Sequence, residues 1–344
     1  MTTRRDVADA AGVSLRTVSN VVNGFPHIAP ATRARVLAEI DRLGYRPSEV
    51  ARTLRVGRSG LIGLMLPELD TPYFAELTRA FVEQGARLGL TVVIDQTQGD
   101  RAAELAVLQR TARGALFDAL VLSPIALTPD DLTILTDDQH VVFLGEEDFP
   151  GFDKVMIDNF TAAKDVVSHM IARGRTRIAS IGAERAAHGA SAQRFAGYQA
   201  ALREAGLPLE ESLIEYVGGF RRREGALAMA RLLEGPARPD AVFCFNDPIA
   251  LGAMRTLYER NVSVPDELMV AGIDGNEEGQ FACPSLTTIS PDKEWIARTA
   301  LERIARRLAG DDLPRETLIG PYTLVAREST MGGVDTVDGS DRPH

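Results

Sequence analysis

Cysteine is scarce in this chain of 344 residues, which has only Cys244 and Cys283. Two thiols exclude a disulfide-stapled scaffold, and we expect a reducing cytoplasm as the location. Cys244 lies in the apolar run 242–245, where we expect a small buried side chain rather than a reactive thiol. No run of about 18 apolar residues occurs, so we expect no membrane-spanning helix, and the N-terminus lacks the apolar stretch of a secretory signal.

Sequence signatures of catalysis are also missing. The chain has no Gly-rich phosphate loop with a Lys, no His-Glu-x-x-His, no Cys-x-x-Cys and no Gly-x-Ser-x-Gly. The histidines are scattered without the spacing of metal ligands, and they are His27, His140, His169, His188 and His344. We therefore expect neither an enzyme nor a bound metal or cofactor.

What the chain does contain is a separation of charge. Residues 1–58 hold ten Arg, no Lys and five acidic residues, which gives a net charge of 10 − 5 = +5. The whole chain carries −10, so residues 59–344 carry −15. A chain of this length suits two or three domains. A small basic domain joined to a large acidic one indicates that the basic part alone meets a polyanion.

Residues 6–20 have the pattern of two short helices joined by a tight turn. Gly12 tolerates the positive φ that ends a first helix, and Ser14 is a natural N-cap for a second. Apolar side chains recur at helical spacing in both segments: Val7, Ala8 and Ala11, then Val18, Val21 and Val22. This pattern predicts a helix-turn-helix and duplex DNA as the partner. The alternative is an ordinary helical bundle with solvated surface charges.

The start of the second helix carries side chains suited to base recognition. Arg16 and Asn20 are four residues apart and share a face, where Arg pairs with guanine and Asn with adenine. Leu15 would touch a thymine methyl group or a sugar, while short polar side chains bind phosphates and set the register. The expected DNA-contacting residues are Thr3, Ser14, Leu15, Arg16, Thr17, Ser19, Asn20, Asn23, His27, Thr32, Ala51 and Leu54.

A third amphipathic helix is predicted at 30–43, with Val36, Ile40 and Leu43 facing inward and Pro30 in its first turn. The basic stretch 48–59 follows. It is too short to be a stable helix alone, so we expect it to order only when a partner holds it.

These motifs resemble the LacI/GalR family of bacterial transcription regulators. The resemblance covers about residues 4–330 and is carried by Asp6-Val7-Ala8, Gly12-Val13-Ser14, Thr17-Val18-Ser19, Val22-Asn23-Gly24, Gly44-Tyr45-Arg46-Pro47, Val50-Ala51-Arg52-Thr53-Leu54 and Leu61-Ile62-Gly63. It implies that the linkers of a dimer form helices in the minor groove, with Leu54 as the wedge and Ala51 at their contact. A linker leucine packed on the core is the alternative for Leu54. Ala29 stands where the family usually has a small hydroxyl residue.

The acidic remainder alternates short apolar runs with amphipathic helices, which indicates parallel sheets covered on both faces. Strands are predicted at 61–66, 91–94, 119–122, 141–144, 177–181, 213–216, 241–245 and 268–271. Two such series predict an α/β, periplasmic-binding-protein-like core of two parallel-sheet lobes behind an all-α helix-turn-helix head. The expected divisions are the head at 1–47, a hinge at 48–59, an effector-binding and dimerisation core at 60–330 (first lobe about 60–158 and 291–320, second lobe about 161–288 and 321–330) and a disordered tail at 331–344.

Polar residues stand where several predicted strands end, which is where ligands bind in such folds. In relatives, residues matching Arg194, Asn246 and Asp274 bind the hydroxyls of a sugar or another small polar effector, through strong directional bonds. The full expected effector set is Tyr73, Phe74, Ser123, Arg194, Phe220, Asn246 and Asp274.

Several of these positions, and the neighbouring Asp247, also have a structural alternative. Asp247 is expected to act as a helix N-cap, and Asn246 and Asp274 have loop hydrogen bonding as their alternative role. Phe74 and Phe220 are as well explained by core packing. Many relatives carry an acid where this chain has Gly145, and we expect the acidic residues 146–148 to form a solvated loop, with one member able to enter the cleft.

The leading hypothesis is a ligand-responsive, dimeric DNA-binding repressor that acts on a palindromic operator. A solute-binding protein that uses the same cleft without DNA is the second hypothesis. The operator, the effector and the direction of its effect stay open, and no tail-driven tetramer is expected.

Overall fold

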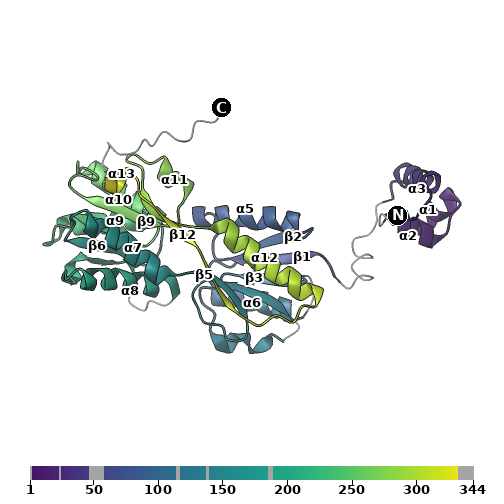
Figure 1. Cartoon of the computed structure of the whole chain (residues 1–344), viewed down its shortest axis with the longest axis horizontal. Helices are drawn as coiled ribbons and strands as arrows, with labels where there is room; N and C mark the ends of the chain where they lie inside the picture. Colours follow the sequence, from purple (N-terminus) through teal and green to yellow (C-terminus); the bar gives the residue numbers. More distant parts are fainter. Residues whose placement is uncertain are drawn as a thin grey trace. The chain divides into compact units, whose positions relative to one another are not determined.

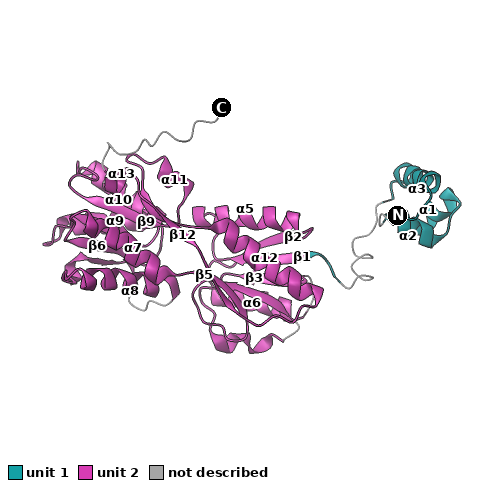
Figure 2. Ribbon diagram, viewed as in Figure 1, with its two compact units in different colours: residues 1–60 teal, residues 61–344 magenta. Residues whose placement is uncertain are grey.

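The protein is described by a computed structural model that covers residues 2–22, 25–45, 58–113, 117–136, 139–184 and 189–331. The chain divides into two compact units, residues 1–60 and 61–344 (Figure 2). Each unit contains its own hydrophobic core. The expected hinge residues Ala51 and Leu54, together with Asn23 and the tail beyond 331, lie outside the described residues.

The described residues of the first unit form three helices: α1 (Arg4–Ala11), α2 (Leu15–Val22) and α3 (Pro30–Leu43). Gly12 and Gly44 end α1 and α3 in the left-handed conformation, with φ of 61° and 60°, as expected for glycine after a helix. The small core is formed by Val7, Ala8, Ala11, Val18, Val21, Val36 and Tyr45. The helix-turn-helix and the third helix predicted from the sequence are therefore confirmed.

The second unit contains two six-stranded sheets (Figure 1). The sheet of the first lobe has the order β11-β5-β4-β3-β1-β2 and is parallel throughout. Its strands are β1 (Leu61–Leu66), β2 (Thr91–Gln96), β3 (Ala119–Leu122), β4 (His140–Leu144), β5 (Asp153–Ile157) and β11 (Thr317–Gly320). The lobe also contains α5 (Pro72–Arg87), α6 (Arg101–Ala112), the 3₁₀ helix η1 (Pro129–Ile134) and α12 (Lys293–Ala309).

The sheet of the second lobe has the order β12-β10-β9-β8-β6-β7. Its strands are β6 (Ile178–Ala183), β7 (Ile214–Tyr216), β8 (Ala241–Cys244), β9 (Met269–Ile273), β10 (Thr287–Pro291) and β12 (Tyr322–Val325). Only β12 is antiparallel to its neighbour, β10. The helices are α7 (Asn159–Ala172), α8 (Gly189–Glu204), η2 (Glu211–Leu213), α9 (Arg222–Glu234), α10 (Asp247–Glu259), α11 (Glu277–Gln280) and α13 (Glu328–Met331).

The chain passes between the two sheets three times, from β5 to α7, from β10 to α12 and from β11 to β12. In the first sheet β5 and β11 are neighbours at one edge, and in the second sheet β10 and β12 are neighbours at one edge. All three crossovers therefore lie on one side of the core, and this side is the natural hinge between the lobes. Strands β5, β10, β11 and β12 were missed by the sequence analysis.

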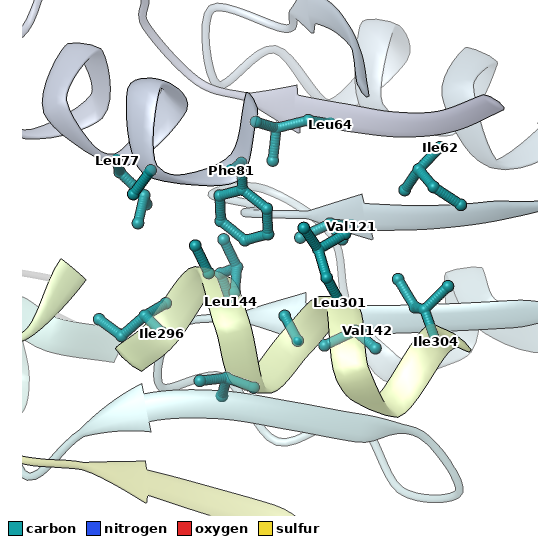
Figure 3. Packing of buried hydrophobic residues seen from close by; sticks show 14 of the residues in the cluster. Ile62, Leu64, Leu77, Phe81, Val121, Val142, Leu144, Ile296, Leu301 and Ile304 are labelled. Atoms are coloured by element: carbon teal, nitrogen blue, oxygen red, sulfur yellow. The ribbon is translucent and has the colours of Figure 1, made fainter. Parts of the chain in front are cut away.

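The core of the first lobe is sealed by helices α5 and α12 on one face of its sheet. Figure 3 shows Phe81 of α5 and Leu301 of α12 beside Leu64, Val121 and Val142 of the strands. Phe81 and Leu301 are fully buried. Truncating such a phenylalanine to alanine costs about 3–5 kcal/mol, so this contact fixes where α12 and its first residue are held. Across the described ranges, no helix is long and apolar enough to cross a membrane.

Candidate DNA-binding head and effector site

The second helix of the head begins with the expected cap. The Ser14 hydroxyl oxygen accepts a hydrogen bond from the Thr17 amide at 3.1 Å, which satisfies one of the free donors at the start of α2. Leu15 is 46% exposed although it is apolar, and Arg16 is exposed beside it. A leucine and an arginine held at the exposed start of a capped helix form a surface suited to the major groove.

The other expected contacts of the head differ in accessibility. Thr3 caps α1, where its hydroxyl accepts from the Asp6 amide at 3.3 Å. His27 is exposed, and Thr17, Asn20 and Thr32 are half-buried. Ser19 is only 9% exposed and lies on the inner side of α2 with its neighbour Val18. The free head thus presents Arg16 and Leu15 openly and Ser19 hardly at all.

In the second unit, Arg194 belongs to a hydrogen-bonded chain that joins both lobes. Its Nε donates to Asn159 Oδ1 at 2.7 Å, and the Asn159 amide nitrogen donates to Glu146 Oε1. Its Nη1 donates to the carbonyl of Phe245. Glu146 follows β4 of the first lobe, Asn159 is the first residue of α7 at a crossover, and Arg194 lies on α8 of the second lobe.

Glu146 therefore turns inward, the alternative that the sequence analysis left open for one member of 146–148, whereas Asp148 is exposed. Burial raises the pKa of its carboxyl group, and the nearby Arg194 guanidinium opposes that rise. Within the described residues, two of the five N–H groups of Arg194 donate to protein atoms, the Asn159 side chain and the Phe245 carbonyl. The arginine is held in a fixed direction before any ligand arrives.

The N-cap of α10 is the residue before the one that the sequence analysis expected. Asn246, not Asp247, is the N-cap of α10, because its Oδ1 accepts from the Ile249 amide at 2.9 Å. Its Nδ2 donates to the Phe220 carbonyl at 2.9 Å. Asp247 is fully buried and accepts from Thr288 Oγ1 at 2.6 Å and from the Asn276 amide at 2.8 Å. The N-cap prediction for Asp247 was wrong, because the chain turns one residue earlier.

Asp274 lies in a loop with unusual backbone geometry. Its φ of 127° is rare for a residue with a side chain. Its amide donates to Ile289 at 2.9 Å, and its carbonyl accepts from Lys293 Nζ at 2.6 Å, which hold it there. Burial raises the pKa of its carboxyl group to about 6, against the opposing effect of Arg194 and Lys293. A buried carboxylate of this kind is a strong acceptor for ligand donors.

Tyr73 and Phe74 start α5 and lie edge to face, with ring centroids 5.3 Å apart. Both are partly buried against the first-lobe core, as Phe220 is against the second. Lys293 Nζ lies 5.4 Å from the centre of the Tyr73 ring, and burial raises the pKa of the Tyr73 hydroxyl. Ser123 directly follows β3 and is 9% exposed.

Further contacts connect residues that the sequence analysis did not select. Glu76 Oε2 pairs with Lys293 Nζ at 2.8 Å, and Glu76 Oε1 accepts from the Glu277 amide at 3.0 Å. Lys293 and Asn159 are the first residues of helices α12 and α7, each shortly after a strand, and Glu76 lies near the start of α5. The polar pair Asp158-Asn159 after Ile157 was the available signal, but β5 begins with Asp153 and Lys154 and does not read as an apolar strand.

Comparison with known proteins identifies the class of protein as a helix-turn-helix regulator with a periplasmic-binding-protein-like core. Residues 3–48 match the model for bacterial regulatory proteins of the lacI family, and residues 167–330 match a periplasmic binding protein-like domain. The HTH-type transcriptional repressor PurR of Mannheimia succiniciproducens is 34% identical over 333 residues, covering 96% of this chain and 98% of that protein. The ribose operon repressor of Escherichia coli K12 is 31% identical, covering 96% and 100%.

A solved lac repressor dimer, bound to operator and the anti-inducer ONPF, has a TM-score of 0.85 to this structure at 26% identity and covers 96% of this chain and 99% of that one. The chain belongs to the lacI family of bacterial regulatory proteins. The fold class predicted from the sequence is confirmed. Its relatives are named as repressors and regulators, which agrees with the expectation that it is not an enzyme.

Proposed function

We propose that this protein is a dimeric repressor in the cytoplasm that binds a palindromic operator and responds to a small, polar, uncharged effector such as a sugar. The observation that carries the effector part is a continuous run of contacts: Arg194 donates to the Phe245 carbonyl, and Asn246 donates to the Phe220 carbonyl. These contacts hold three of the expected effector residues against one another at the ends of neighbouring elements, which supports a common site.

The charges near these residues favour an uncharged effector. Lys293 is paired with Glu76 at 2.8 Å and capped by two backbone carbonyls, so it has little to offer an anion. Arg194 already lies beside Glu146 and Asp274. A phosphate or carboxylate would have to approach these carboxyl groups, and the two described cations beside them, Arg194 and Lys293, are already engaged with acids. Hydroxyl groups can accept from Arg194 and donate to Glu146 and Asp274.

For the DNA part, we propose that residues 1–47 read the operator, with Arg16 and Asn20 facing base edges. We further propose that residues 48–59 form the hinge, that Leu54 wedges into the minor groove, and that 60–330 form the sensor and dimer core. The exposed cap of α2 and the excess of arginine support the first assignment. Effector binding would change the lobe arrangement and with it the operator affinity, and the coupling is reciprocal.

The first experiment identifies the operator by selection from a randomised duplex library, followed by titrations at several salt concentrations. Binding should weaken steeply with salt, because phosphate contacts release counterions. Arg16→Ala should lose about 1–3 kcal/mol of discrimination at one base pair in each half-site. Unchanged discrimination across a half-site library would remove Arg16 from the readout. A chain that binds no duplex at low salt would leave the solute-binding alternative.

The second experiment screens for the effector by thermal shift, with neutral sugars and nucleosides beside their phosphates, since a bound effector raises stability by mass action. A compound that acts should be uncharged and should alter operator affinity. Asp274→Ala should abolish that response and keep operator binding. A persistent response in Asp274→Ala would show that the site lies elsewhere.

A further inference from the structure

An arginine of the second lobe bridges to two acidic residues of the first lobe. Arg221 Nη1 lies 2.9 Å from Asp70 Oδ2, and its Nη2 lies 3.1 Å from Glu68 Oε1 and 3.3 Å from Asp70 Oδ1. Asp70 and Glu68 stand between β1 and α5, and Arg221 is the N-cap residue of α9. The Arg221 guanidinium thus forms a bidentate ion pair with Asp70 of the opposite lobe and a second ion pair with Glu68.

Both sides of this contact are held in place before they meet. The Thr71 hydroxyl donates to Glu68 Oε2 at 2.6 Å, and the Leu69 amide donates to Gln96 Oε1 at 3.2 Å. On the other lobe, Asn246 fixes the backbone next to Arg221 by donating to the Phe220 carbonyl at 2.9 Å. Because both loops are anchored, less side-chain and loop freedom is lost when the ion pairs form.

The sheet order places this contact far from the hinge. The three crossovers start or end at β5 and β11 of the first sheet and at β10 and β12 of the second, and all four strands lie at or next to one edge of their sheet. Arg221 follows β7, the opposite edge strand of its sheet, and Asp70 follows β1, the strand next to the opposite edge of the other sheet. An opening rotation about the crossovers therefore separates Arg221 from its partners by more than it separates groups near the hinge.

The Lys293–Glu76 contact is the useful comparison. Lys293 begins α12 immediately after the crossover from β10, and its ammonium group contacts both Glu76 and the carbonyl of Asp274. Its side chain is 10% exposed, whereas that of Arg221 is 56% exposed. The contact near the hinge is shielded from solvent, while the distant contact is open to water and salt.

We propose that Arg221, Glu68 and Asp70 form an ionic latch that holds the two lobes closed when no effector is bound and that opens with rising salt. The latch concerns the core alone and stands whether or not the proposed effector class is right. An exposed pair of this kind shifts an equilibrium modestly, by about fivefold at most per pair in low salt. That is enough to set how often the effector residues are accessible.

The test measures the lobe distance in the full chain without any effector. Single-molecule energy transfer is recorded between dyes at Ala102→Cys on α6 and Arg203→Cys on α8, two exposed positions on different lobes. The exposed Cys283 is changed to serine, and the buried Cys244 is kept. Labelled chains are diluted with unlabelled chains so that each dimer carries one dye pair.

At 0.05 M salt, Arg221→Ala should have an open-to-closed ratio about fivefold higher than that of the unaltered chain. The ratio of this variant should hardly change as salt rises to about 1 M, where the Debye length falls to about 3 Å. The unaltered chain should approach the variant as salt rises. Arg222→Ala is the matched control: Arg222 is the next residue and is similarly exposed, but it pairs with Glu278 inside the second lobe. It should behave as the unaltered chain does.

The exchange is made in a chain that carries Glu68→Gln, so that no second carboxylate remains beside position 221. In that background, Arg221→Glu with Asp70→Arg reverses the remaining pair and should restore the closed fraction that Arg221→Glu alone loses. Failure of the exchange to restore closure would mean that the pairing of charge is not what holds the lobes, and would overturn the latch. So would a closed fraction in Arg221→Ala that matches the unaltered chain, or an equal loss in Arg222→Ala.

Discussion

Changing Asn159 to aspartate tests whether one amide orients Arg194. The buried Asn159 side chain lies between Arg194 Nε, which only donates, and Glu146 Oε1, which only accepts when ionised. An amide can serve both partners because it carries one donor and one acceptor end. An aspartate still accepts from Arg194, but it places a second carboxylate against Glu146.

The size of the effect follows from this arrangement at pH 8. The substitution removes one hydrogen bond and leaves a charged acceptor unpaired, which costs about 1–3 kcal/mol. Two facing carboxylates add repulsion, and a stronger bond to Arg194 offsets part of it. We expect a net loss of about 2–4 kcal/mol, or an unfolding temperature lower by roughly 4–10 °C.

The pH dependence gives the direction. Burial already raises the pKa of Glu146, and a second carboxylate raises the proton affinity of the folded pair further above that of the unfolded chain. The folded state of Asn159→Asp then binds more protons than the unfolded state, so its stability falls as pH rises. The deficit should be smallest near pH 5, where the two acids share a proton, and largest near pH 8.

The assay is thermal or urea unfolding followed by circular dichroism from pH 5 to 8. Glu146→Gln combined with Asn159→Asp exchanges the amide and the acid, keeps both hydrogen bonds and should regain most of the lost stability. An unfolding temperature for Asn159→Asp that runs parallel to the unaltered chain at every pH would refute the argument. A double variant as unstable as the single one would refute it as well.

Three further outcomes are expected from equally local arguments. Asp247→Asn should remove a loss of stability that otherwise develops as pH rises from about 4 to 8, because burial and the nearby Asp274 raise the pKa of Asp247 to about 8. An asparagine can still bond Thr288 and the Asn276 amide. Urea unfolding at pH 6 and 8 checks this, and an unchanged dependence of stability on pH would contradict it. Gly252→Ala should destabilise the second lobe by more than about 1 kcal/mol, since its Cβ would stand 1.8 Å from the Arg222 carbonyl where α9 meets α10. Calorimetry should show this loss, with Gly218→Ala, whose Cβ would meet no atom within 4 Å, as the comparison. Glu104→Ala should lower the free energy of unfolding by about 3 kcal/mol or more, because the buried Glu104 carboxylate accepts hydrogen bonds from the amides of Ile125, Ala126 and Leu127 at 2.8–3.0 Å. Glu104→Gln should lower it by less. Equal losses in the two variants would show that these hydrogen bonds do not account for the stability.

The head could be predicted almost completely from the sequence because its signals are local. Gly12 and Ser14 act on the residues next to them: one ends a helix by its positive φ, and the other caps the following helix. The apolar spacing of Val7, Val18 and Val36 needs no distant partner to be read. The strands of the core were recognised wherever they are wholly apolar, as in β1, β3 and β8.

The strands that were missed depend on contacts from far along the chain. Strand β5 begins with Asp153, whose charge is buried only because Arg303 and Arg307 of α12 pair with it at 2.8 and 2.6 Å. Arg303 and Arg307 are about 150 positions away from Asp153 in the sequence, and no local pattern predicts these ion pairs. The same holds for β11 and β12, which stand beside strands of earlier segments.

For the site, the sequence determined which residue types follow the strands, since the carboxyl ends of parallel strands must collect polar groups. It thereby selected Arg194, Asn246 and Asp274. Only the tertiary structure decided what each one does. Asn246 rather than Asp247 caps α10, and Asn159 and Lys293 link the lobes at the crossovers. A hydrogen bond between distant segments depends on where two backbones meet, and that position is set by packing of the whole core.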